Sequence, residues 1–506
     1  MQEKIRRVDE ISSLIESEKK QGHRIVHCHG VFDLLHPGHV RHFQEARKLG
    51  DTLVVSLTPD RFVNKGPGRP TFNEQLRSEQ LAALSCIDFV VLNDSPDAVS
   101  IIKRVKPDLY VKGSEYQKHE DDVTGKISEE VAAVESVGGE VHYTHDIVFS
   151  SSSLLNQHFD KDAKRLAPFI ESFRKQFSAQ DVVNHVDALS KMRVLVVGDA
   201  IVDEYQYVSP LGQSGKGQQI TASLQDEEKF LGGSLIIANH LADFVQEVTL
   251  LTAVGKECPN RPWIEEGLAK NVKQHFINID EPTLLKKRYV QKDGKSINKL
   301  FETYSSHHAL LNARQSEEVT DFIEKEGDHF DLVLVCDFGN GFTDPSIVAA
   351  LSQVTSFLAV NTQTNSGNRG FNVVTHYDRA NFISLNEPEL RLAAHDKYSR
   401  LECVTEDIAR VLSCSTVSVT RGSEGVYIFS QGESITIPAL TMQTVDRVGA
   451  GDSYFSLASL CVANGYSPLL AGFVGSVAAA IDVQIVGNRE AINKAGLCKY
   501  ITRLLK

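Results

Sequence analysis

The stretch Gly30-Val-Phe-Asp-Leu-Leu-His-Pro-Gly-His39 links a short apolar run, residues 24–32, to a segment whose apolar residues recur at helical spacing from Val40 to Leu49. Gly50 then supplies a helix stop. A strand that enters a helix through such a turn directs backbone N–H groups and two imidazoles at one point, where a phosphate fits. A lone histidine pair near a helix start is more often structural, so the surrounding sequence must decide its role.

The same alternation of apolar runs and helical periodicity extends from this motif to about residue 158, which is typical of a parallel sheet covered by helices. We predict a Rossmann-like α/β domain over residues 1–159. The runs expected to form its strands are residues 24–32, 52–57, 88–92, 109–112 and 140–143.

A second α/β alternation occupies residues 191–506, and residues 160–190 between the two are charged and helix-prone, which predicts a helical linker. A chain of 506 residues is also too long for a single core. Residues 218–224 and 284–300 are expected to form a small β-lid. The main strands are expected at residues 193–197, 332–336, 357–360, 382–385 and 417–420.

The motif Asp446-Arg-Val-Gly-Ala-Gly-Asp452 lies in this second segment, just before a helical stretch. The backbone N–H groups of Gly449, Ala450 and Gly451 can form an anion hole for a transferring phosphoryl group. Asp452 then lies where a base would accept the proton of an attacking hydroxyl. An isolated G-x-G-D pattern is more often a tight turn with a helix cap, so this prediction too depends on its surroundings.

The composition excludes several classes of protein. A net charge of −13 and a pI near 5.8 argue against nucleic-acid and membrane-surface binding, which need a basic surface. The eight scattered cysteines contain no C-x-x-C pair, so neither a zinc site nor a disulfide framework is indicated. No apolar run reaches about 18 residues. We expect a cytoplasmic protein with small-molecule partners.

The first motif has neighbours that together resemble the cytidylyltransferase-like nucleotidyltransferases over residues 24–158. One departure is Cys28-His29, where the family has Thr-Asn. The matching elements are the H-x-G-H signature, the preceding Gly30-Val-Phe-Asp33, residues 46–51, residues 65–70, Arg77, residues 111–113, Tyr116 and the serine run 150–153.

The resemblance implies direct attack of a substrate phosphate on the α-phosphorus of a nucleoside triphosphate, with Mg²⁺ sharing the charge of the leaving pyrophosphate. His36 and His39 would stabilise the transition state, and Lys48 would help to hold the triphosphate. The further nucleotide-binding residues implied are Gly30, Phe32, Asp33, Gly38, Arg47, Lys112, Gly113, Ser150, Ser151 and Ser152.

Residues 192–492 resemble the ribokinase-like (PfkB) carbohydrate kinases through Gly198-Asp199 with Asp203, Gly232-Gly233 with Asn239, Asn386-x-x-Glu389, Thr420-Arg-Gly422 and the anion-hole motif. Asp452 would be the catalytic base. Asn386 and Glu389 would organise Mg²⁺. The resemblance further implies a nucleotide site of Thr420, Arg421, Gly422, Gly449, Ala450 and Gly451, and a sugar site of Asp203, Gly232, Gly233 and Asn239. Arg288 is expected to join the sugar site, because a basic residue there could meet a phosphate on the sugar; the alternative is that Lys287 and Arg288 form a solvated charge pair.

A kinase and a nucleotidyltransferase in one chain resemble the bifunctional heptose kinase/adenylyltransferases, with the two domains in reversed order. Residues 209–219 do not reproduce the heptose kinase lid, and Asp446-Arg-Val448 replaces the usual Asp-Thr-Thr or Asp-Val-Thr.

We predict ATP-dependent phosphorylation of a sugar or of a sugar phosphate resembling heptose 7-phosphate. We also predict transfer of AMP onto a sugar 1-phosphate, giving an ADP-heptose-like product for surface polysaccharide. The alternatives are a CTP-dependent enzyme for another sugar or polyol, and a non-catalytic sensor of nucleotides or sugar phosphates. A homodimer through the kinase lid is expected.

Overall fold

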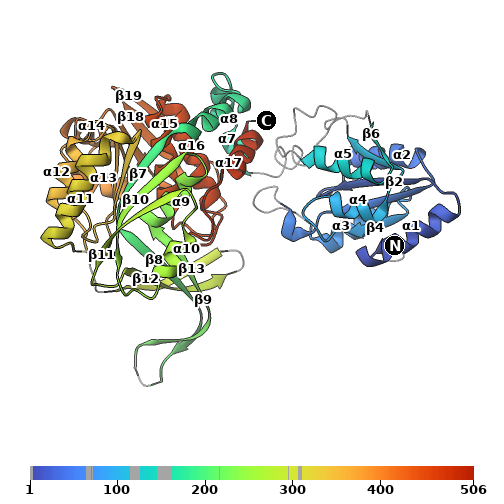
Figure 1. The fold of residues 1–506 in the computed structure, drawn as a ribbon, viewed down its shortest axis with the longest axis horizontal. Coiled ribbons are helices and arrows are strands. Elements are labelled where there is room, and N and C mark those ends of the chain that lie inside the picture. Colours follow the sequence, from blue (N-terminus) through green and yellow to red (C-terminus); the bar gives the residue numbers. More distant parts are fainter. Residues whose placement is uncertain are drawn as a thin grey trace. The chain divides into compact units, whose positions relative to one another are not determined.

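The computed structural model describes residues 4–63, 70, 72–113, 126–144, 161–215, 217–293, 296–305 and 310–505. The chain divides into two compact units, Met1–Lys164 and Arg165–Lys506 (Figure 1). Within the described residues, no helix combines the length and the apolar composition needed to cross a membrane.

The first unit is built on a six-stranded sheet with the order β1-β4-β3-β2-β5-β6, and every neighbouring pair is parallel. From β2 the chain moves outward through β3 and β4, then returns to the other side of β2 with β5 and β6. In such sheets ligands bind beyond the carboxyl ends of the strands at this switch point. The strands are β1 (Ile5–Arg6), β2 (Ile25–Gly30), β3 (Thr52–Leu57), β4 (Phe89–Leu92), β5 (Leu109–Gly113) and β6 (Glu140–Thr144).

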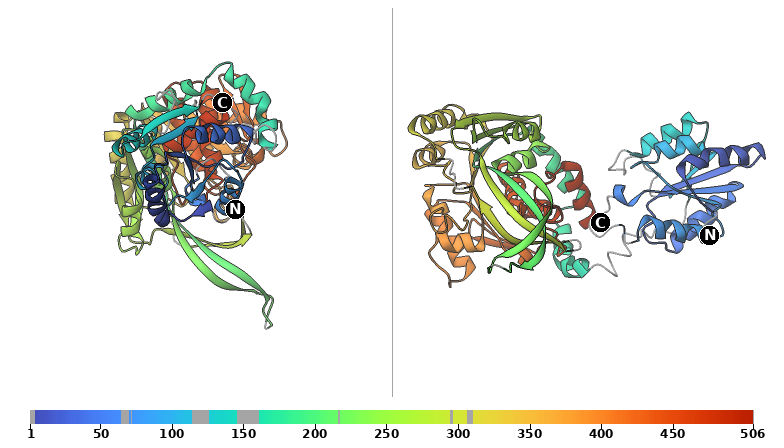
Figure 2. Two further views of the ribbon diagram at one scale, coloured as in Figure 1. Left: turned by 90° about the vertical axis from the view of Figure 1, so that its right-hand side faces the viewer. Right: turned by 90° about the horizontal axis from the view of Figure 1, so that it is seen from below.

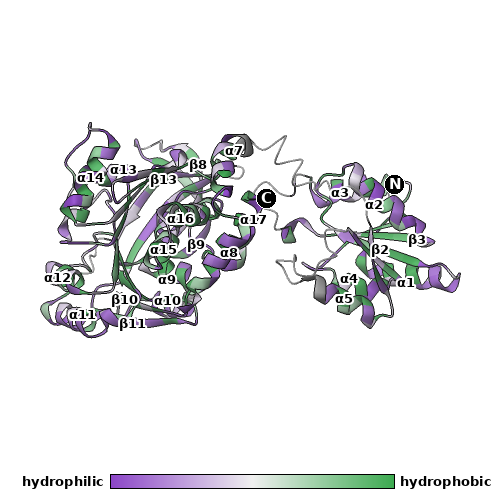
Figure 3. Ribbon diagram, turned by 90° about the horizontal axis from the view of Figure 1, so that it is seen from above, coloured by the Kyte–Doolittle hydropathy of each residue, from purple (hydrophilic) through white to green (hydrophobic). Residues whose placement is uncertain are grey.

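Helices cover both faces of this sheet, as the alternation of side chains along β2 requires. Val26 and Cys28 pack with Phe43 of α2 on one face, and Ile25 packs with Ile11 of α1 on the other. Figure 3 shows the hydrophobic character of β3 between these layers. The helices are α1 (Val8–Lys20), α2 (Pro37–Lys48), α3 (Glu74–Ala82), α4 (Val99–Val105) and α5 (Lys126–Ser136). The predicted parallel α/β fold is confirmed.

The second unit contains a nine-stranded sheet with the order β11-β10-β7-β14-β15-β16-β17-β18-β19. The first seven strands in this order are parallel, and β18 and β19 continue the sheet antiparallel. The strands are β7 (Arg193–Gly198), β10 (Glu247–Gly255), β11 (Val272–Ile279), β14 (Leu332–Asp337), β15 (Phe357–Thr362), β16 (Phe382–Asn386), β17 (Thr416–Thr420), β18 (Val426–Ser430) and β19 (Glu433–Ile437).

Two helical layers enclose this sheet (Figure 1). Val194 and Val196 face the layer of α9, α15, α16 and α17, while Leu195 and Val197 face α11 to α14. The helices are α9 (Ser234–Ala242), α10 (Arg261–Gly267), α11 (Ala313–Glu326), α12 (Pro345–Gln353), α13 (Glu387–Ala393), α14 (Leu401–Val411), α15 (Ala450–Ala463), α16 (Pro468–Asp482) and α17 (Lys494–Leu504).

A separate four-stranded sheet, with the order β13-β12-β8-β9, forms the expected lid. Its strands are β8 (Ala200–Gln213), β9 (Ile220–Gly233), β12 (Leu284–Asp293) and β13 (Ser296–Tyr304). The hairpin of β8 and β9 is longer than the lid segment predicted at residues 218–224. Residues 200–208 of β8 are buried and residues 209–213 are exposed, and this outer half projects from the second unit (Figure 2).

The segment expected to be a linker, residues 160–190, contains α7 (Lys161–Arg174) and α8 (Ala179–Ala188), and from Arg165 onward it belongs to the second unit. Phe173 is buried and stacks on Phe473 of α16 with 4.1 Å between ring centroids. Val182 and Val186 of α8 enter the same core. The two helices thus cover the kinase-like core, because their apolar faces have a partner there.

Phe173→Ala should lower the free energy of unfolding of the second unit by about 3–5 kcal/mol, since a buried aromatic ring is lost and a cavity remains. Calorimetry on the full chain would show one of the two unfolding transitions shifted. Lys175→Ala, an exposed neighbour, should leave both transitions in place. Equal behaviour of the two variants would show that α7 does not stabilise the core.

Candidate active sites

The two histidines of the first motif lie together at the start of α2. His36 is the N-cap, and its Nδ1 accepts a hydrogen bond from the backbone N–H of Gly38 at 3.1 Å. The His36 and His39 ring centroids are 4.0 Å apart. Burial lowers the pKa of His36, which keeps its imidazole neutral near pH 7. The pair, with the helix N-terminus, forms a set of polar groups suited to an anion.

The turn before the histidines has a strained backbone that packing holds in place. Phe32 adopts a left-handed conformation with φ +46°, and its ring packs on Phe43 at 5.1 Å and on His39 at 5.5 Å between centroids. A Cβ on Gly30 would lie 2.9 Å from the Phe32 ring, so a larger residue there would displace this ring. The buried Asp33 accepts a hydrogen bond from the backbone N–H of Phe72.

Arg77 positions this turn although it belongs to another element. Its side chain is fully buried in α3 and donates to the backbone carbonyls of Val31 and Thr58, while it also binds the Asp60 carboxylate at 2.6 Å. The loops after β2 and β3 are therefore fixed to one guanidinium. The sequence pattern included Arg77 in the resemblance but did not assign it this role.

Other expected residues of the first site share the carboxyl edge of the sheet. Lys112 and Gly113 end β5 beside β2, and the Lys112 ammonium lies 2.7 Å from the Glu130 carboxylate. Ser150, Ser151 and Ser152 lie outside the described residues, as do residues 64–69 of the predicted motif.

Of the two residues that depart from the family pattern, Cys28 and His29, only His29 lies at the carboxyl edge of the sheet. Cys28 is buried in the core, whereas His29 hydrogen-bonds through Nδ1 to Ser56 at 2.8 Å and through Nε2 to Thr58 at 3.3 Å. His29 therefore braces the ends of β2 and β3.

Arg47 and Lys48 do not join the histidines. Both lie at the carboxyl end of α2, and twelve helical residues put them about 16 Å from the helix start. Lys48 is exposed, and Arg47 contacts the Gly50 carbonyl and, at 3.4 Å, the Asp88 carboxylate. The geometry gives no support to a triphosphate contact from the same protomer at the His36 site.

In the second unit, Asp452 lies in the first turn of α15 with its side chain directed at buried polar groups. Gln363 Nε2 donates to Asp452 Oδ1 at 2.7 Å. Burial raises the pKa of Asp452 to about 7; the Gln363 hydrogen bond and the Lys286 charge act against this, and the charges of Asp203 and Glu389 add to it. Its protonation therefore changes near neutral pH, as suits a general base.

The expected anion hole precedes Asp452. Gly449 has φ +94°, and a Cβ there would lie 2.4 Å from Asn488 Oδ1 and 2.7 Å from Asp482 Oδ2, so a larger residue cannot take its place. Space is open beside Gly451, where a Cβ would meet no atom within 4 Å. The first N–H groups of α15 face this opening without helical partners of their own.

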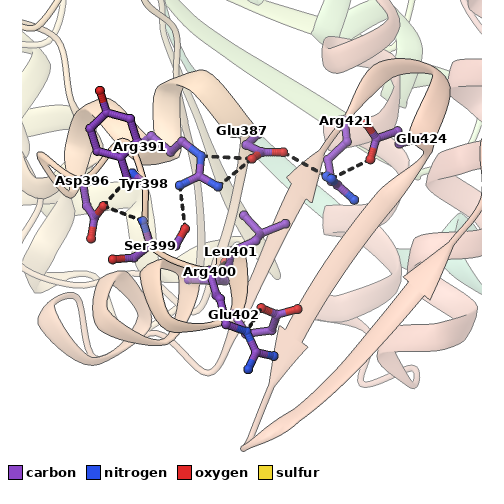
Figure 4. A network of polar contacts seen from close by, with 11 residues as sticks. Glu387, Arg391, Asp396, Tyr398, Ser399, Arg400, Leu401, Glu402, Arg421 and Glu424 are labelled. Carbon is purple, nitrogen blue, oxygen red and sulfur yellow. Dashed lines mark hydrogen bonds and ion pairs between the residues drawn. The ribbon is translucent and has the colours of Figure 1, made fainter.

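A cavity of about 250 Å³ adjoins the anion hole. It is lined by Thr420 and Gly422 after β17, by Leu440, and by Ala450 and Gly451. The expected nucleotide residues are thus brought together. Arg421 is an exception, because its guanidinium is bound by the carboxylates of Glu387 at 2.9 Å and Glu424 at 2.5 Å (Figure 4).

The sugar-side residues converge on the lid. Arg288 of β12 forms an ion pair with Asp203 of β8, and a second with Glu302 at 3.3 Å. A Cβ on Gly232 would lie 2.6 Å from Asp203 Oδ2, and Gly233, with φ +59°, passes close to the Asp199 carbonyl. Asp203 and its two glycines therefore form one closely packed corner.

Lys286 is a site residue that the sequence reasoning missed. Lys286 is buried, and burial, the largest effect, lowers the pKa of its ammonium. The negative charges of Asp203, Asp199 and Asp452 act in the opposite direction and raise it. Lys287 faces the other way and pairs with Glu204 at 2.8 Å. Strand alternation in β12 would have shown that Lys286 and Arg288 share one face.

Asn239 has a different role from the one expected. Its amide donates to the Gly267 carbonyl at 2.8 Å and accepts from the Ala269 N–H at 2.9 Å. The side chain thus holds the loop after α10 against α9. We find no contact from Asn239 to Asp203 among the described interactions.

Asn386 and Glu389 form a capping box at the start of α13. Asn386 Oδ1 accepts the Glu389 N–H at 2.8 Å, and Glu389 accepts the N–H groups of Asn386 at 3.0 Å and Thr364 at 3.1 Å. Burial raises the pKa of Glu389 to about 7.

These carboxylates fit Mg²⁺ that arrives with a nucleotide. Burial raises the pKa of both Glu389 and Asp452, and a cation beside them would favour their ionised forms. Each Glu389 oxygen keeps a lone pair for a further bond. The described residues contain no cluster of three or more His, Cys, Asp or Glu side chains that could hold a metal ion.

Comparison with known proteins matches both resemblances. Residues 191–495 match the model of the pfkB family carbohydrate kinases, and residues 27–165 match the cytidylyltransferase-like model. The N-terminal part is 44% identical over 140 residues to the bifunctional protein HldE of Syntrophotalea carbinolica and 42% identical over 140 residues to that of Geotalea uraniireducens. Each match covers 27% of this chain and 27% of the relative, so the chain spans about a quarter of the length of these curated relatives.

Among solved structures, the tetrameric inhibited form of phosphofructokinase-2 from Escherichia coli aligns with a TM-score of 0.50 and 12% identity. The alignment covers 62% of this chain and 100% of that one. At this identity the likeness concerns the fold alone, and the predicted ribokinase-like architecture of the second unit is confirmed.

Proposed function

Because the chain belongs to the pfkB family of carbohydrate kinases, we propose that its second unit transfers the γ-phosphoryl group of ATP to a hydroxyl of a sugar or sugar phosphate. The observation that carries this proposal is the position of Asp452, which is buried directly after the open anion hole at Gly451 and lies within the electrostatic reach of the lid residue Lys286. A base there can reach a hydroxyl whose sugar lies under the lid.

The chemistry of each part follows from its position. Asp452 accepts the proton of the attacking hydroxyl, and the first N–H groups of α15 bind the oxygens of the γ-phosphoryl group, where negative charge develops. Gln363 holds the Asp452 carboxylate in place and favours its ionised form. Glu389 would help to hold Mg²⁺ that is bound with the nucleotide, and the cation would supply charge neutralisation.

The first unit is proposed to transfer a nucleotidyl group onto a sugar 1-phosphate with release of pyrophosphate. The phosphate of the acceptor is already a nucleophile, so the protein has only to align it and stabilise the α-phosphorus in transfer. His36, His39 and the start of α2 are suited to that work. The relatives matched by this unit carry the word bifunctional in their names, which supports the two-step assignment.

The residues of the lid bear on the choice of acceptor. Lys286, buried in the lid, favours an acceptor with its own phosphate, such as heptose 7-phosphate, and Arg288 on the same face is already paired with Asp203 and Glu302. AMP transfer from ATP, giving a nucleotide sugar such as ADP-heptose for surface polysaccharide, is preferred to a CTP-dependent reaction on another sugar or polyol. A homodimer that associates through the lid, and a cytoplasmic location, complete the proposal.

Incubation of the full chain with a panel of sugar phosphates and each nucleoside triphosphate, with products identified by mass, tests the assignment of substrates. We expect an ADP-sugar from ATP and the sugar 1-phosphate. A CDP-sugar would select the alternative donor. Nucleotide binding without any product would select the non-catalytic sensor.

Two substitutions test whether each unit carries out the reaction proposed for it. Asp452→Asn should lower sugar-dependent ADP formation by about 10²–10⁴-fold because the general base is lost. It should leave pyrophosphate release from sugar 1-phosphate unchanged. His39→Ala should do the reverse, with a loss of about 10²–10³-fold in pyrophosphate release. Each variant is the control of the other, and loss of both activities in either variant would contradict the assignment.

The kinase reaction should depend on pH through Asp452. Only the deprotonated carboxylate can accept a proton, so kcat/KM for the sugar should rise with pH and level off above about 7, where the raised pKa of Asp452 lies. Gln363→Leu removes a hydrogen bond that lowers this pKa, so the rise should move to higher pH. An unmoved profile in Gln363→Leu, or a wild-type rise near pH 4, would contradict the role of Asp452.

A further inference from the structure

Arg447 lies two residues before Gly449, and its side chain lines the cavity beside the anion hole together with Ala450 and Gly451. Among the described residues that line this cavity, it alone carries a formal charge. The remaining lining is made of small, hydroxyl-bearing and apolar side chains such as Thr420 and Leu440. Such walls accommodate a nucleoside, but they do not balance a triphosphate.

The backbone of Arg447 is fixed while its guanidinium is available. Asp446 Oδ1 accepts the N–H groups of Arg447 at 2.7 Å and Val448 at 3.2 Å. The Arg447 side chain is exposed and makes no ion pair with another residue in the described part of the chain. Arg421 differs, because Glu387 and Glu424 already neutralise it (Figure 4).

The charges around the anion hole favour a cation beside the phosphates, in addition to Mg²⁺. Asp452 and Glu389 are buried carboxylates that act on one another electrostatically, and when ionised they repel a triphosphate. The start of α15 offers only about half a positive charge. A guanidinium binds phosphate oxygens through two parallel hydrogen bonds and stays charged at any pH of interest.

We propose that Arg447 binds the phosphate tail of the nucleotide in the kinase cavity. The resembling kinases carry Thr or Val at this position, so this chain has a full positive charge where they have an uncharged side chain. The inference rests on the proposed kinase function and names a further binding residue for it.

Kinetic constants of the sugar-dependent ADP-forming reaction test the proposal at this site alone. Arg447→Ala should raise the KM for ATP and the inhibition constant of ADP by about tenfold or more, as expected for loss of a charge-assisted hydrogen bond. The inhibition constant of adenosine, which has no phosphate, should not change. Arg447→Lys should recover part of the loss, because it restores the charge without the paired geometry.

Arg400→Ala provides the matched control, since Arg400 is an exposed arginine of the second unit outside the cavity. All of its constants should equal those of the wild type. Unchanged ATP and ADP constants in Arg447→Ala would overturn the inference. An equal loss for adenosine would also overturn it, because the side chain would then contact the base or ribose.

If the wild-type chain phosphorylates none of the sugars offered, the proposed function fails, and calorimetry still decides the inference. ATP and adenosine would be titrated separately into the wild-type and Arg447→Ala full-length chains. Weaker ATP binding with unchanged adenosine binding supports Arg447 as a phosphate ligand. Identical ATP isotherms reject it.

Discussion

The carboxylate of Asp446 joins the parts of the second unit on which its site depends. Its Oδ2 accepts the Tyr205 hydroxyl at 2.6 Å and the Gly487 N–H at 3.0 Å, and its Oδ1 lies 2.9 Å from the Lys299 ammonium. Tyr205 and Lys299 belong to the lid, whereas Asp446 begins the anion-hole turn. One buried carboxylate thus connects the lid, the anion-hole turn and the loop after α16.

Asp446 and Asp452 lie six residues apart, but their surroundings shift their pKa values in opposite directions. Burial raises the pKa of both, but at Asp446 the Lys299 charge and several donors outweigh it, so its pKa is lowered. Asp452 has one neutral donor and carboxylates nearby, and its pKa is raised. Asp446 therefore stays charged and holds the fold, while Asp452 can exchange a proton near neutrality.

Much of this architecture could be predicted from sequence, because apolar runs of strand length between helical patterns leave few alternatives to a parallel sheet. The roles of individual site residues were harder to predict. A twelve-residue α2 separates Lys48 from His36 by its length alone, which the sequence already implied. Lys286 was recoverable from strand alternation. The use of Asn239 to hold a loop, and the pairing of Arg421 with two carboxylates, depend on segments distant in sequence.

The two candidate sites share a helix N-terminus that can bind phosphate, and they differ in the ionisable side chains beside it. Each follows a glycine-containing turn into a helix N-terminus, which supplies backbone N–H groups to a phosphate. In the proposed reaction of the first site, a sugar phosphate attacks as an anion and needs no base, and the site offers His36, which burial keeps neutral. In the proposed reaction of the second site, a sugar hydroxyl must lose its proton, and the site buries a carboxylate whose pKa has risen to about 7. The protonation chemistry of each site thus matches the group proposed to attack phosphorus.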